Sequence, residues 1–124
     1  MTKFCPEELD LAQLFKAYGL DWTPAVGHYV LDQSGLIGSE SPFQDGVYFI
    51  LDLKHFLRRS ITIEAMKASL CWLPDWQDAR AILDGLGVPP DVVAQRLQES
   101  QAILSGSERL ELYRLIEDRL TGTC

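Results

Sequence analysis

The chain has 124 residues, of which 47% are hydrophobic and 23% are charged, a composition typical of one globular domain with a real hydrophobic core. Its net charge of −7 disfavours general binding to nucleic acids or anionic membranes, because the protein's own field would repel each phosphate. No apolar run approaches the roughly 20 residues that span a bilayer. We therefore expect a single globular domain over residues 1–124, with no nucleic-acid partner and no membrane partner.

The cysteines and the first residues favour a cytoplasmic location. Cys5, Cys71 and Cys124 are odd in number, far apart and without metal-ligand spacing, so they do not resemble a secreted disulfide framework. The opening segment MTKFCPEELD becomes acidic at once and has no apolar stretch of the kind found in signal peptides. Cys71 is interpreted as a small buried hydrophobic residue and Cys124 as an exposed one.

The first elements in the chain are predicted to be a helix over residues 6–18 and a small β-hairpin over residues 27–38. Pro6 suits the first turn of a helix, and Gly19 is placed to end it. Residues 28–31 are strand-forming types, residues 32–35 have turn chemistry, and residues 36–37 could return as the second strand.

The segment 46–59, GVYFILDLKHFLRR, is predicted to be the central helix of the fold. Its first turns are apolar on every side, which is typical of a helix buried at one end. Farther along, the residues sort at about 100° per residue into two arcs. One arc is apolar and holds Phe49, Ile50, Leu53, Phe56 and Leu57, and the other is polar and holds Asp52, Lys54, His55, Arg58 and Arg59.

Four further helices are predicted after this segment. They cover residues 63–72, capped by Thr62, and 76–86, capped by Asp75, then a segment from Pro90 toward Ile103 and Leu104, and a terminal helix from about residue 108. Ser105 and Glu108 have the spacing of a capping box. The sequence thus predicts a mainly α fold: a compact helical bundle of about six helices with the small hairpin near residues 27–38.

The polar arc of segment 46–59 is the first candidate site. Its cations could bind an anion or an acidic partner, but cations at the end of a helix also complement its dipole, and this structural interpretation is preferred. Asp52 and His55 have helical ligand spacing, and His28 is the one other histidine, so the evidence for a metal is weak and none is assigned. No nucleophile elbow or phosphate-binding loop is present, and no cofactor or catalytic residue is assigned.

Aromatic residues form the second candidate site. Trp72 and Trp76 flank Pro74, and Tyr48 lies in the apolar part of segment 46–59. Packing in the core is the simpler interpretation, and a partly open aromatic wall or an interface anchor is the alternative. Val47, Tyr48 and Leu51 lie off the main apolar arc of the expected helix. The first helix, the hairpin or another chain must cover them. The amphipathic terminal helix is also compatible with a homodimer, and a homodimer is favoured because two-fold association is the commonest state of small soluble oligomers.

Two classes of function stay open from the sequence. The favoured one is a small, non-catalytic, cytoplasmic interaction or regulatory module that binds a protein partner, a second copy of itself or both. The alternative is a small-molecule or anion-binding protein, or an enzyme, with its pocket between residues 38–46 and 46–59. The residues expected to serve either function are Tyr48, Asp52, Lys54, His55, Arg58, Arg59, Trp72 and Trp76.

Overall fold

The structure is a computed structural model that describes residues 3–37, 41, 44–54 and 62–122. Six helices and three strands have both ends within this part of the chain. The helices are α1 (Pro6–Ala17), α3 (Ile63–Ser69), α4 (Trp76–Gly85), α5 (Pro90–Glu99), α6 (Ala102–Ser105) and α7 (Glu108–Thr121). The strands are β1 (Tyr29–Asp32), β2 (Val47–Phe49) and β3 (Leu70–Leu73). A mainly α fold with a small antiparallel sheet is confirmed, whereas the bundle arrangement stays a prediction.

The sheet has the order β2-β1-β3, and both strand pairs are antiparallel. Leu31 lies opposite Val47 on one side and Cys71 on the other, while Val30 lies opposite Tyr48 and Trp72. Because successive side chains of a strand point to opposite faces, Leu31 and its neighbours join one apolar core and Val30 and its neighbours join another. The sheet therefore separates two hydrophobic cores.

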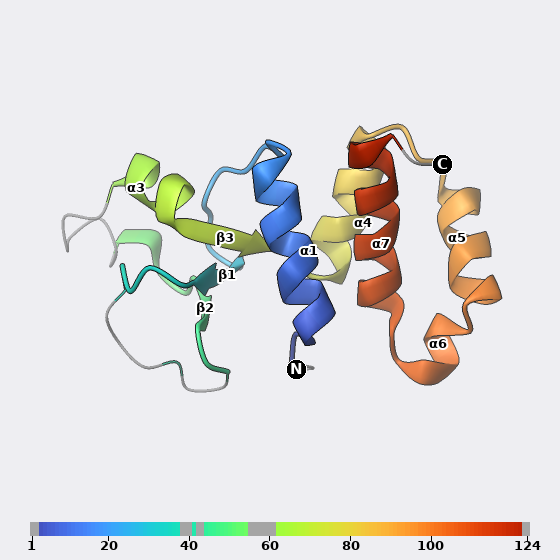
Figure 1. The fold of residues 1–124 in the computed structure, drawn as a ribbon, viewed down its shortest axis with the longest axis horizontal. Coiled ribbons are helices and arrows are strands. Elements are labelled where there is room, and N and C mark those ends of the chain that lie inside the picture. The colour runs from blue at the N-terminus through green and yellow to red at the C-terminus, as the bar shows by residue number, and fades with distance from the viewer. Residues whose placement is uncertain (1–2, 38–40, 42–43, 55–61, 123–124) are drawn as a thin grey trace.

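The larger core is formed by one face of the sheet and by residues of α1, α4, α5, α6 and α7. Figure 1 shows α1 between the sheet and the pair α4 and α7, with α5 and α6 at the far end of the molecule. Phe15 of α1 and Tyr113 of α7 meet at 5.4 Å between ring centroids, and both are almost fully buried. Tyr113 also donates a hydrogen bond of 2.5 Å to the carbonyl of Pro74, which ties α7 to the start of α4.

The predicted central helix is wrong over its first part. Residues 47–49 form β2, Ile50 is fully buried in the smaller core, and only Leu53 and Lys54 are helical among the described residues of segment 46–59. A fully apolar run of five residues has no period, so it does not distinguish a helix from a strand buried on both faces. Gly46 has a φ of +76°, which lets the chain turn directly into the strand.

Two other predicted elements need correction for the same reason. The expected helix over 63–72 ends at Ser69, and the apolar run 70–73 is β3. The expected hairpin keeps its first strand and its turn at 32–35, but the partner strand is β2 and not residues 36–37. Residues 34–37 instead wrap around the Asp32 carboxylate, which accepts hydrogen bonds from their backbone N–H groups as far as Ile37 at 2.9 Å.

The remaining helices follow the sequence closely, apart from the end of α5 and the cap of α7. The Thr62 and Asp75 side chains accept hydrogen bonds from Ala65 and Asp78 as predicted, at 3.0 and 2.8 Å. The segment from Pro90 divides at Ser100 and Gln101 into α5 and α6. The predicted capping box at Ser105 is wrong, because α7 follows Ser107, whose side chain makes no cap bond.

Candidate interaction surface

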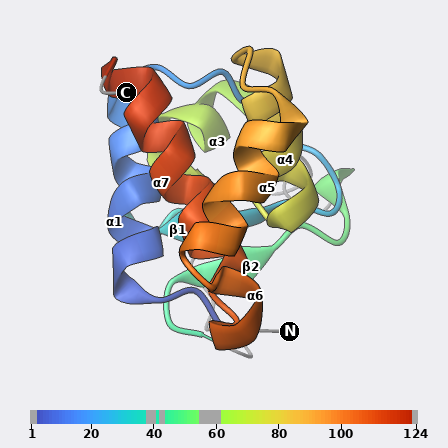
Figure 2. The ribbon, with the colours of Figure 1, turned by 90° about the vertical axis from the view of Figure 1, so that its right-hand side faces the viewer.

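The chain turns a corner between α5 and α6 (Figure 2). Two apolar side chains are strongly exposed there. Ala102 is fully buried, while Ile103 is 69% exposed and Leu104 is 87% exposed. The chain reaches this arrangement through Gln101, which has a left-handed φ of +55°, and leaves it through Gly106, with a φ of +70°. Ala102 is the buried residue of the one-turn helix α6, and the two side chains after it point to solvent.

A groove of about 520 Å³ lies beside these two side chains. Its lining residues are all uncharged: Ala94, Leu97, Gln98, Gln101, Ile103 and Leu104. Leu97 forms an apolar floor and is only 8% exposed. In a chain with a net charge of −7, an apolar groove lined without a single charge is a distinct feature of the surface. We call the groove together with Ile103 and Leu104 the α5–α6 surface.

Ion pairs join α5 to α7. Arg96 of α5 lies 3.8 Å from Glu111 and 3.5 Å from Asp118 of α7. Within α5, Gln95 donates a 2.9 Å hydrogen bond to Glu99, and within α7, Arg114 contacts Glu111 at 2.9 Å, as its spacing predicts. The two Arg96 contacts therefore help to hold α5 against α7.

The terminal helix α7 turns its apolar residues toward the core. Residues of α7 pack against α1, α4 and α5, and Leu112, Tyr113 and Ile116 are completely buried. Its apolar stripe therefore belongs to the core. Of the three apolar residues in segment 46–59 that seemed in excess, Val47 is buried and Tyr48 is half-buried, while Leu51 is 77% exposed.

Of the predicted site residues that the structure describes, Tyr48 and Trp72 both pack against the smaller core, and Trp76 does not. Tyr48 lies on β2 in the smaller core, and Asp52 and Lys54 are exposed beyond it, where the Asp52 carboxylate accepts a 3.0 Å hydrogen bond from the Lys54 N–H. His55, Arg58 and Arg59 lie outside the described residues. The proposed Asp52–His55 pair is therefore not tested. Within the described part of the chain, no group of three His, Cys, Asp or Glu side chains could hold a metal ion.

The two candidate tryptophans lie in different places. Trp76, at the start of α4, is 44% exposed, and the Arg80 guanidinium carbon lies 5.1 Å from its ring centroid. Trp72 lies on β3, 6.4 Å from Trp22 between ring centroids. Sequence reasoning placed Trp72 at the end of one helix and Trp76 at the start of the next, so it missed the pairing of Trp72 with Trp22.

His28 belongs to this same aromatic group. Its Nδ1 accepts a hydrogen bond of 3.0 Å from the Trp22 indole, and its ring centroid lies 5.0 Å from that of Trp72. An imidazole nitrogen that accepts this bond carries no proton, so any proton of a neutral His28 is on Nε2.

The thiols of Cys5 and Cys71 are free. Burial raises the pKa of the Cys71 thiol to about 11, and the prediction of a small buried hydrophobic residue is confirmed. Burial also raises the pKa of Cys5. Neither thiol has the lowered pKa that activates a nucleophilic cysteine.

The described residues thus form a small, mainly α fold with a three-stranded sheet and an uncharged groove beside α5 and α6. Comparison with protein-family models, curated proteins and solved structures gives no match. Among the described residues, no helix has both the length and the apolar character needed to cross a bilayer.

Proposed function

We propose that this protein is a small, non-catalytic interaction module of the cytoplasm that associates with a second copy of itself through the α5–α6 surface. The observation that carries the proposal is the exposure of Leu104 and Ile103 beside an uncharged groove. Exposed apolar patches on soluble proteins commonly mark the sites at which they bind other molecules.

A second copy is the occupant that fits these features. In a two-fold dimer the same surface is used twice, so a protruding apolar pair must lie beside a groove that can receive its counterpart. Ile103 and Leu104 form the protruding pair, and the adjoining groove supplies the space. Because the groove lining carries no charge, two copies with a charge of −7 each would meet where their direct repulsion is weakest.

The cytoplasmic part of the proposal rests on the thiols. Two free cysteines and no disulfide between them suit a reducing compartment. Alkylation of a cell lysate in denaturant without reductant, followed by mass spectrometry of the protein, checks this. All three cysteines should carry the alkyl label, and a stable disulfide would contradict the assignment.

Sedimentation velocity over a range of protein concentrations tests self-association, with a matched pair of substitutions. Leu104→Glu places a charge at the centre of the α5–α6 surface, and we expect it to raise the dimer dissociation constant at least tenfold, which corresponds to about 1.4 kcal/mol. Leu51→Glu makes the same chemical change at a residue that is also strongly exposed but lies beyond β2. It should leave the dissociation constant unchanged.

Both substitutions are at exposed positions, so each should alter the free energy of unfolding by less than about 0.5 kcal/mol, which thermal melts can verify. A wild-type protein that sediments as a monomer at every concentration would overturn the proposal. So would a dimer that Leu104→Glu does not weaken.

The alternative from the sequence, a pocket between residues 38–46 and 46–59, depends on residues that the structure describes only in part. It receives no support from the described residues. The pocket lined by Trp72 lies between α1, α3 and β3.

A further inference from the structure

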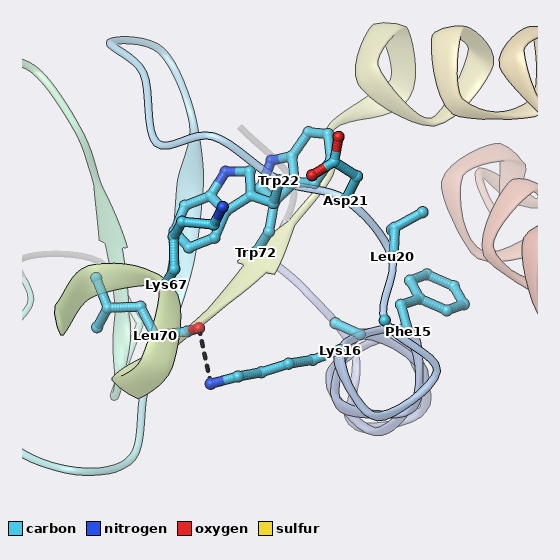
Figure 3. A pocket seen from close by; sticks show the side chains of 10 residues that line it. Phe15, Lys16, Leu20, Asp21, Trp22, Lys67, Leu70 and Trp72 are labelled. Atoms are coloured by element: carbon cyan, nitrogen blue, oxygen red, sulfur yellow. Dashed lines mark hydrogen bonds between the residues drawn. The ribbon is translucent and has the colours of Figure 1, made fainter. Parts of the chain in front are cut away.

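A pocket of about 340 Å³ lies between α1, the segment after it, α3 and β3 (Figure 3). Its lining is mostly apolar, with three charged side chains: Ala12, Phe15, Lys16, Gly19, Leu20, Asp21, Trp22, Lys67, Leu70 and Trp72. The volume is at the small end of the range for ligand sites, so a ligand with one or two rings fits better than a nucleotide.

The aromatic wall of this pocket is held rigidly. Trp22 and Trp72 stack with their ring planes only 14° apart. Trp22 is 8% exposed, and its indole N–H is fixed by His28. Because the wall is preformed by the core, a planar ring could pack on it without much cost in side-chain ordering.

Trp72 contributes its ring to this wall. Its indole N–H is buried with almost no accessible surface and has no acceptor among the described residues, so a ligand in the pocket would contact the ring and not the N–H.

Two lysines bring positive charge to the opening. Lys16 is held in place, because its ammonium donates hydrogen bonds to the carbonyls of Ala68 and Leu70, at 2.6 and 3.1 Å. Figure 3 shows it reaching from α1 toward Leu70, with Lys67 entering from α3. Lys67 is exposed and has no ion-pair partner among the described residues.

The charged side chains of the pocket lining favour a ligand with a single negative charge. Two lysines and Asp21 give the lining a net charge of +1, in a protein whose total charge is −7. A monoanion is favoured by this local field, whereas the protein's remaining negative charge and Asp21 disfavour ligands with two or more negative charges.

We propose that this pocket binds a small aromatic monocarboxylate. The ring lies on the Trp22–Trp72 wall, and the carboxylate pairs with Lys67. This site is separate from the α5–α6 surface, and neither proposal depends on the other.

Isothermal titration calorimetry with 1-naphthoate tests the proposal, with 1-naphthamide as the neutral probe of nearly the same shape. For a ligand of this size a dissociation constant on the order of 0.1–1 mM is expected. The amide should bind at least about fivefold more weakly, because it cannot pair with Lys67. Equal affinities for the two probes, or no saturable binding of naphthoate at about 5 mM, would overturn the proposal.

Two lysine variants locate the carboxylate. Lys67→Gln should weaken naphthoate binding about fivefold and leave naphthamide binding unchanged. Lys54→Gln, the same change at an exposed lysine outside the pocket lining, should affect neither probe. An equal effect of the two variants on naphthoate would mean that only overall charge matters, and would overturn the assignment of Lys67.

The three tryptophan indole N–H resonances of ¹⁵N-labelled protein give an independent readout. Naphthoate should shift the Trp22 and Trp72 resonances because its ring lies against both indoles, and should leave that of Trp76 in place because Trp76 lies outside the pocket lining. An unmoved Trp72 resonance at saturating naphthoate would overturn the predicted contact.

Discussion

Arg109 of α7 and Glu8 of α1 form an ion pair across 101 residues of sequence, with 2.5 Å between Arg109 Nε and the Glu8 carboxylate. The Glu8 side chain is 5% exposed, and its carboxylate also accepts a hydrogen bond from the backbone N–H of Cys5 at 2.9 Å. The Arg109 guanidinium carbon lies 3.8 Å from the Phe4 ring centroid. This pair therefore joins the start of α1 to the start of α7 and holds the N-terminal segment between them.

The neighbouring glutamates of α1 offer a matched test of this pair. Glu8→Gln removes the charge of a buried carboxylate that accepts hydrogen bonds from the Arg109 guanidinium and from the Cys5 backbone N–H. We expect it to lower the free energy of unfolding by about 2 kcal/mol. Glu7→Gln makes the same change in an exposed pair with Arg114 and should have little effect. Urea denaturation at pH 7 measures both. A loss from Glu8→Gln no larger than that from Glu7→Gln would show that the buried pair adds nothing.

Tyr113 provides a second test in the larger core. Tyr113→Phe removes the hydroxyl that donates to the Pro74 carbonyl and leaves that carbonyl buried, so a loss of about 1–2 kcal/mol is expected. Tyr18→Phe is the control, because Tyr18 is 53% exposed at the end of α1. Its effect should be within error in the same urea experiment, and similar losses from both variants would contradict a special role for the Tyr113 hydroxyl.

Asp32 makes the stability of the sheet depend on pH. Burial alone would raise the pKa of its carboxyl, but the hydrogen bonds from Ile37, Ser34 and Leu36 outweigh burial and hold the pKa below its ordinary value of 3.8. A carboxylate with a lowered pKa in the folded state stabilises the protein above its unfolded pKa, and this contribution is lost as the pH falls through the folded pKa.

Asp32→Asn should therefore cost about 1–2 kcal/mol at pH 7, since an amide can accept fewer of these bonds. The difference from wild type should shrink as the pH falls below about 4, where the wild-type carboxyl becomes protonated. Urea titrations at pH 7 and at several lower values measure this. A difference that stays constant across that range would show that charge is not what the Asp32 turn requires.

The sequence predicted helices well where polar and apolar residues alternate with a helical period, and it failed where the chain is apolar without interruption. The caps at Thr62 and Asp75 were predicted because they are local chemistry. The strands β2 and β3 were not, because each is buried on both faces of a sheet whose pairings span many residues. Once Trp72 was assigned to a helix, its contact with Trp22 could not be anticipated.

The exposed corner could be predicted only in part, for a similar reason. Ile103 and Leu104 fit the apolar period of a helix that continues from Pro90, and that pattern implies burial. The break at Gln101 reverses the outcome, because it turns Ala102 inward and the next two residues outward. A glutamine with a positive φ carries no strong signal in a single sequence, whereas glycine or asparagine would have carried one.

Cys71 gives a chemical test of the larger core. With a pKa of about 11, only about one molecule in a thousand carries the thiolate at pH 8, and the sulfur is buried as well. Iodoacetamide should therefore label Cys5, which is partly exposed, much faster than Cys71 in the folded protein. Peptide mass spectrometry separates the two sites. In denaturant the two rates should become similar, and fast labelling of Cys71 without denaturant would contradict its burial.

The break at Gln101 yields the final prediction, which links stability to the α5–α6 surface. Among the described residues, Gln101 is the one with a positive φ that is not glycine, and this conformation costs a side chain roughly 1 kcal/mol. Gln101→Gly should relieve that strain and raise the free energy of unfolding by up to about 1 kcal/mol, partly offset by the greater freedom of glycine in the unfolded chain. Gln95→Gly, in the interior of α5, should lower it by about 1 kcal/mol. Urea denaturation distinguishes these opposite signs. A destabilised Gln101→Gly variant would mean that the Gln101 side chain itself holds the corner in place.

The same substitution has a second expected outcome, in self-association. Gln101→Gly keeps the turn that exposes Ile103 and Leu104. It should therefore preserve the self-association that Leu104→Glu weakens.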